Sequence, residues 1–130
     1  MTIEFSYLKK QFRDEEAEAI WRKIKPVVTE GRFTLGVEVD RFEEAYAAKA
    51  GAAYAVGVNS GTDALALPLM ALGAAGSEVI CPAFSFIATA GAIKQAGAIP
   101  VFCDVGEDMN IDVDRIEEKI TPSTSFIMPV

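Results

Sequence analysis

The chain has 130 residues, of which 51% are hydrophobic and 24% charged, and its formal net charge is −7. This length and composition suit a globular domain with a hydrophobic core and exclude a disordered or collagen-like chain. The negative charge opposes nucleic-acid binding. Because the sequence has no histidine, these residues cannot supply a serine-histidine triad, and we expect no metal site.

Cellular location and cysteine state follow from short stretches of the sequence. The longest apolar runs are too short to span a membrane, and the N-terminus lacks the features of a secretion signal, so we expect a cytoplasmic protein with no membrane contact. Cys81 and Cys103 each lie in an apolar, strand-like run. Such cysteines usually behave as small buried hydrophobic residues, and we expect no disulfide between them.

Residues 1–52 are predicted to form an N-terminal helical segment. Acidic residues after Asp14 favour a helix that continues to Ile24, and Pro26 is expected to kink or end it. A glycine-bounded loop follows at residues 31–36. Apolar residues then recur at helical spacing from Val39 to Ala50, just before Gly51, which predicts a second helix.

Residues 53–130 are predicted to form the first βαβ units of an α/β domain. Apolar runs predict strands at 54–58, 78–81, 99–103 and 125–130, separated by helices at 63–72, 86–95 and about 112–120. Continuously apolar strands that alternate with helices indicate a mainly parallel sheet with flanking helices. The last strand would leave an apolar edge, so we expect more chain or a second subunit to cover it and otherwise aggregation or dimerisation.

The segment from Val58 to Leu65 joins a predicted strand to a predicted helix. Free amides of the first helical turn bind anions, Gly61 allows close approach, and the hydroxyls of Ser60 and Thr62 can add donors. The same small, polar residues also suit an ordinary helix start. Both interpretations, a phosphate site and a structural turn, remain open on these residues alone.

The next loop, residues 82–86, is predicted at the same edge of the sheet, where open parallel sheets place their ligands. It contains two phenylalanines, and one of them could stack on a flat aromatic cofactor, although a ring that packs on the core is the alternative. Asp104 follows the next strand and either faces the same crevice or caps the next turn, of which the cap is favoured. A dinucleotide site is not predicted, because no G-x-G-x-x-G follows the first strand, and no Walker lysine follows Gly61.

Together, these segments resemble the DegT-type (DegT/StrS-like) sugar aminotransferases in their order and spacing. The matching segments are Phe5–Gln11, residues 31–36 with Phe42 and Glu43, Asn59–Leu65, Glu78–Ile80, Pro82–Thr89, Ile99–Phe102, and Thr121 and Pro122 with residues 126–130. The resemblance implies an aspartate-aminotransferase-like large domain (pyridoxal-phosphate fold type I) and a homodimer. It also implies pyridoxal 5′-phosphate as cofactor and amino transfer from glutamate or glutamine to a nucleotide-linked keto sugar.

The resemblance also implies roles for particular residues. Phe86 is expected to stack on the pyridine ring, and Thr89 to lie near the cofactor. Phe33 and Thr34 are expected at the substrate mouth. The residues expected to surround the phosphate, chiefly through the amides of Thr62 and Asp63, are Ser60, Gly61, Thr62 and Asp63.

Two features depart from the family pattern or fall outside the matched segment. The family's Schiff-base lysine comes after the residues matched here, so we expect no catalytic residue in this chain and no amino transfer by the chain alone. Pro68 is expected to interrupt the helix after the phosphate turn.

A sugar dehydratase of the same fold and a non-catalytic binding or interaction domain remain alternative functions.

Overall fold

The computed structural model describes residues 11–130, which group into two compact units. One unit ends at Gly57, and the other extends from Val58 to Val130. The resembling segment Phe5–Gln11 lies outside the described residues except for its last member. No helix within residues 11–130 combines the length and apolarity needed to cross a bilayer.

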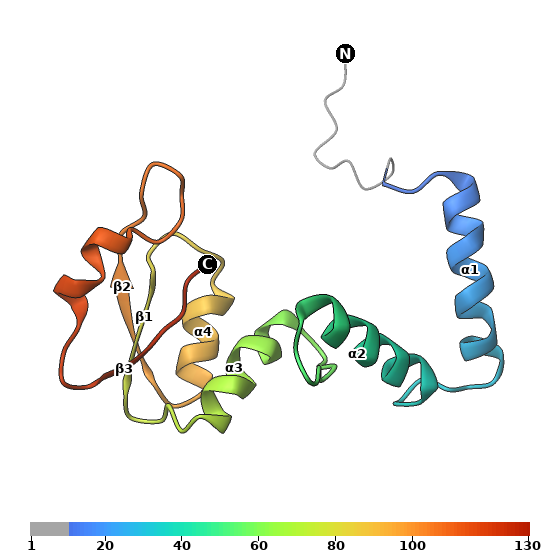
Figure 1. The fold of residues 1–130 in the computed structure, drawn as a ribbon, viewed down its shortest axis with the longest axis horizontal. Coiled ribbons are helices and arrows are strands. Elements are labelled where there is room, and N and C mark those ends of the chain that lie inside the picture. The colour runs from blue at the N-terminus through green and yellow to red at the C-terminus, as the bar shows by residue number, and fades with distance from the viewer. Residues whose placement is uncertain (1–10) are drawn as a thin grey trace, which may run out of the picture. The chain divides into compact units, whose positions relative to one another are not determined.

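From residue 11 on, the first unit contains two helices, α1 (Asp14–Thr29) and α2 (Val37–Ala50), which Figure 1 shows. At the start of α1, the amide of Arg13 donates to Glu16 Oε2 at 2.8 Å. The helix does not end at Pro26 but continues to Thr29. Proline lacks only its own amide donor, and after it the Glu30 amide donates to the Pro26 carbonyl at 3.0 Å. α2 ends at Gly51, whose φ of 66° suits glycine, as the spacing predicted.

The predicted strand at residues 54–58 is wrong. No strand forms there, and the Tyr54 side chain is 88% exposed. The Gly57 amide donates to a side chain, Glu43 Oε1, at 2.6 Å. A strand is stabilised by a neighbouring backbone, and none of the three strands within residues 11–130 pairs with this segment, so apolar character alone does not make it extended sheet.

The second unit is built on a three-stranded parallel sheet in the order β2-β1-β3 (Figure 1). Its strands are β1 (Glu78–Pro82), β2 (Ile99–Cys103) and β3 (Thr124–Ile127). The central residues Val79 to Cys81 have no exposed surface, as expected for a strand covered on both faces. The predicted α/β class with a mainly parallel sheet is confirmed.

Each face of this sheet has its own hydrophobic cluster. On one face, Val79 and Cys81 of β1 pack with Leu69 of α3 (Gly61–Ala71) and Ile93 of α4 (Ala88–Gln95). On the other face, Ile80 and Cys103 pack with Ile111. Figure 1 shows α4 on one side of the sheet and the segment after β2 on the other. Cys81 and Cys103 are buried free thiols, as predicted, and burial raises the pKa of Cys81.

The predicted helix at 112–120 is wrong in type. Two short 3₁₀ turns form instead, η2 (Val113–Arg115) and η3 (Glu117–Lys119). The end of β2 holds the backbone of Asp112 extended, since the Asp112 amide donates to the Asp104 carbonyl at 2.9 Å. Ile120 is already extended before Pro122. The segment between these points therefore folds into short, tight turns.

The helix after the phosphate turn was expected to break at Pro68, but α3 passes through this residue to Ala71. The proline ring removes one backbone donor, which costs about 3 kcal/mol in a helix interior. Burial of Ala66 and Leu69 offsets this cost. After Pro68, the helix is closed by a 2.9 Å hydrogen bond from the Leu72 amide to the Pro68 carbonyl.

Candidate functional site

The second unit contains a cavity of about 630 Å³ beside the first turns of α3 and α4. Its wall is completed by residues that follow β1 and β3. Because the carboxyl ends of parallel strands are where open α/β sheets bind ligands, this cavity lies in the place expected for a site. It is lined by Gly61, Thr62, Leu65, Ser85, Phe86, Ala88, Thr89, Pro129 and Val130.

The start of α3 presents two free backbone donors. Ser60 is the N-cap: its hydroxyl accepts from the Asp63 amide at 3.1 Å and donates to Asp63 Oδ2 at 2.8 Å. Within residues 11–130, the amides of Gly61 and Thr62 have no acceptor. A Cβ added at Gly61 would meet nothing within 4 Å, so the surface at this turn is open. Two amides can therefore bind an anion here.

The loop between β1 and α4 presents an aromatic ring to the same cavity. The predicted helix at 86–95 starts two residues later, at Ala88, which leaves Phe86 in the loop with its side chain 77% exposed. Phe84, in the same loop, does not line the cavity. The large exposed surface of Phe86 is apolar and flat, and it suits stacking on a planar ring.

The cavity brings together four of the predicted cofactor residues, Gly61, Thr62, Phe86 and Thr89. Ser60 and Asp63 do not line it, because they bond to each other at the helix start. The amide of Asp63, predicted as a phosphate donor, is thus already engaged by Ser60. Phe33 and Thr34 lie in the first unit on an exposed loop, and their place at the substrate mouth stays a prediction.

Five lining residues were not singled out from the sequence. Ser85 lies in the loop of residues 82–86, and in the sequence only its position next to Phe86 indicates that it could line the cavity. The other four are apolar, and nothing in their local pattern separates a cavity wall from a core. They are Leu65, Ala88, Pro129 and Val130.

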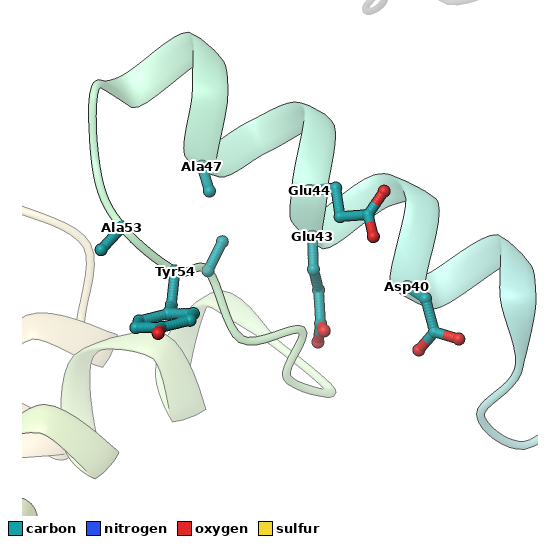
Figure 2. A pocket seen from close by; sticks show the side chains of 7 residues that line it. Asp40, Glu43, Glu44, Ala47, Ala53 and Tyr54 are labelled. Carbon is teal, nitrogen blue, oxygen red and sulfur yellow. The ribbon is translucent and has the colours of Figure 1, made fainter.

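A second cavity, of about 330 Å³, lies in the first unit between α2 and the segment after it. Figure 2 shows the carboxylates of Asp40, Glu43 and Glu44 around it, with Tyr54 on the following segment. Three acidic side chains with no basic residue in the wall disfavour a phosphorylated ligand. The cavity beside Phe86 is therefore the better candidate for an anionic aromatic ligand.

No group of three or more histidine, cysteine or acidic side chains within residues 11–130 is arranged to hold a metal ion. Among the described acids, Asp108 has a lowered pKa, because the Asn110 side chain and amide donate hydrogen bonds to its carboxylate. Asp108 does not line the cavity.

The cap at Ser60 gives a direct test of how the start of α3 is built. Ser60→Ala is expected to lower the free energy of unfolding by about 1 kcal/mol, since the Asp63 amide loses its acceptor. Ser60→Asn should retain most of the stability, because asparagine caps as well as serine. Urea titration of the two variants and the parent chain measures this. A full loss in Ser60→Asn would contradict the capping role.

A model of the DegT/DnrJ/EryC1/StrS aminotransferase family matches residues 14–130. The chain belongs to this family. The predicted resemblance is confirmed.

Two sequence relatives match the chain over nearly its whole length. It is 38% identical over 130 residues to a 3-oxo-glucose-6-phosphate:glutamate aminotransferase of Bacillus subtilis (strain 168), covering 98% of this chain and 30% of the relative. It is 40% identical over 130 residues to a UDP-2-acetamido-2-deoxy-3-oxo-D-glucuronate aminotransferase of Pseudomonas aeruginosa, covering 98% and 36%. The chain thus spans about a third of these relatives' length.

A solved structure also matches the fold of the chain. The crystal structure of NtdA from Bacillus subtilis with bound cofactor PMP matches with a TM-score of 0.91 and 37% identity, covering 98% of this chain and 30% of that one. The predicted aspartate-aminotransferase-like fold of type I is confirmed.

Proposed function

We propose that the cavity beside Phe86 binds pyridoxal 5′-phosphate and that this chain is the cofactor-binding part of a sugar aminotransferase. The whole protein would move an amino group from glutamate or glutamine to a nucleotide-linked keto sugar. The observation that carries the proposal is the shared cavity: two free amides, at Gly61 and Thr62, and one exposed aromatic ring, at Phe86, line the same space.

The residues present fit this cofactor. Its phosphate needs several donors in a place of positive potential, which the first turn of a helix provides. Its ring is flat and aromatic, and the Phe86 side chain offers an exposed face of the same kind. Apolar walls at Leu65, Ala88 and Pro129 suit the unsubstituted parts of the ring.

Each group of residues would then do a separate task. The amides of Gly61 and Thr62 bind the phosphate, Phe86 orients the ring, and the apolar walls exclude water. Bound there, pyridoxal phosphate supplies the electron-withdrawing ring that lets an amino group pass between two carbon skeletons.

The names of the relatives support the substrate class, since those quoted above act on oxo sugars carrying a phosphate or a nucleotide. A homodimer follows from the family resemblance, and we include it in the proposal together with a cytoplasmic location. The two free buried thiols agree with a reducing compartment.

The activity is tested in the full-length protein that carries this chain. With pyridoxal phosphate, glutamate and a nucleotide-linked keto sugar, we expect an amino sugar and 2-oxoglutarate in equal amounts, measured by mass spectrometry. A deoxygenated sugar formed without 2-oxoglutarate would instead support the dehydratase. Failure to bind pyridoxal phosphate at all would support the non-catalytic domain and contradict the proposal.

A further inference from the structure

Two large apolar side chains stand exposed in succession beside the cavity. Phe86 and Ile87 are each 77% exposed, and both precede the first helical residue of α4. Water-exposed apolar side chains on a loop gain little from packing, so their own contacts cannot hold them in one orientation. Any fixed orientation of Phe86 must come from the backbone and from its neighbours.

Thr89 makes two hydrogen bonds to the loop before it, one with Ser85 and one with Phe86. The hydroxyls of Ser85 and Thr89 lie 2.8 Å apart and form a hydrogen bond, and the Thr89 amide donates to the Phe86 carbonyl at 3.0 Å. Thr89 therefore bonds both to the residue before Phe86 and to the carbonyl of Phe86 itself. Thr89 is a firm anchor, because its side chain is only 4% exposed and lies in the first turn of α4.

We propose that the hydroxyl pair of Ser85 and Thr89 is a positioning device that fixes the loop so that Phe86 faces the cofactor ring. The proposal rests on the proposed function for the identity of the ligand, but the ordering of the loop can be measured without any ligand. Both residues also line the cavity, so the device lies at the site itself.

The position of each residue separates this role from a structural one. Ser85 is exposed, so water can replace its partner and the loss of its hydroxyl costs the fold little. Without the bond, the loop from Ser85 to Ile87 gains conformational freedom, and a ligand must order it again on binding. A single hydrogen bond of this kind corresponds to about a fivefold loss of affinity.

The test uses matched variants of the 130-residue chain. Ser85→Ala and Thr89→Val each remove one hydroxyl, whereas Ser85→Thr and Thr89→Ser retain it. Ser77→Ala is the control, because it removes a comparable hydroxyl whose 2.8 Å bond to the Ala74 carbonyl lies elsewhere. Unfolding midpoints verify that each variant is folded.

Two measurements distinguish the ordering of the loop from the identity of the ligand. The first is the ¹⁵N order parameter of the Phe86 and Ile87 amides without ligand, which we expect to fall in Ser85→Ala and Thr89→Val only. The second is pyridoxal phosphate titration followed by induced circular dichroism, which reports how rigidly the bound ring is held. We expect about fivefold weaker binding and a reduced signal in the same two variants, with recovery in Ser85→Thr.

The order parameters and the affinities together support or overturn the positioning role of the hydroxyl pair. If the order parameters fall but the parent chain binds no pyridoxal phosphate, the positioning device is supported and the proposed function fails. If the order parameters stay at the parent value, the device is overturned, whether or not affinity changes. Equal effects in Ser77→Ala would also overturn it, since the loss would then be general.

Discussion

Phe86→Ala is expected to weaken the binding of pyridoxal phosphate to the chain by on the order of tenfold or more. The side chain is mostly exposed without ligand, so a stacked ring would remove apolar surface from both partners. The same exposure means that alanine costs the fold little. Equilibrium dialysis or isothermal titration calorimetry of parent and variant measures the change.

The loop contains its own control. Phe84 has the same side chain two residues away and is 68% exposed, but it does not line the cavity. Phe84→Ala should therefore bind pyridoxal phosphate as the parent does. Equal weakening in the two variants would mean that general loss of apolar surface, and not stacking by Phe86, explains the effect.

Ile93→Ala is expected to lower the free energy of unfolding of the second unit by about 2–5 kcal/mol. Ile93 has no exposed surface and packs from α4 onto Val79 and Cys81 of the central strand. Alanine would leave a cavity between helix and sheet, and that space would be filled only in part by relaxation. Urea unfolding followed by far-UV circular dichroism measures the loss.

Ile87→Ala is the matched control, because the same side chain is removed from an exposed position six residues earlier. Surface substitutions of this kind usually change stability by less than about 0.5 kcal/mol. A similar loss in both variants would contradict the assignment of Ile93 to the core between α4 and the sheet.

Much of the second unit could be predicted because its signals are local. The apolar runs that became β1 and β2 are short and bounded by turn residues, and β1 is buried on both faces. The start of α3 was recognisable because Ser60 is a good N-cap and Gly61 follows it. The two loops that share the cavity follow from parallel strand order.

Other features depend on contacts that no local pattern shows. Residues 54–58 are as apolar as a strand, but only a neighbouring backbone could make them one. The turns after Asp112 depend on the bond that the Asp112 amide donates to the Asp104 carbonyl, a contact across the intervening loop that no periodic pattern shows. By contrast, the Asp63 amide donates to the Ser60 hydroxyl three residues earlier, an ordinary N-cap bond that the local sequence indicates. The prediction that this amide binds phosphate did not take that bond into account.

One ligand is expected to contact the amide turn of α3 and the ring of Phe86 together. Amide and aromatic NMR shifts of the chain, followed during a pyridoxal phosphate titration, test it most directly. We predict saturable shifts at the Gly61 and Thr62 amides and at the Phe86 ring, with inorganic phosphate moving only the two amides. Shifts confined to the acidic cavity around Asp40 and Glu44, or none at Gly61, would contradict it.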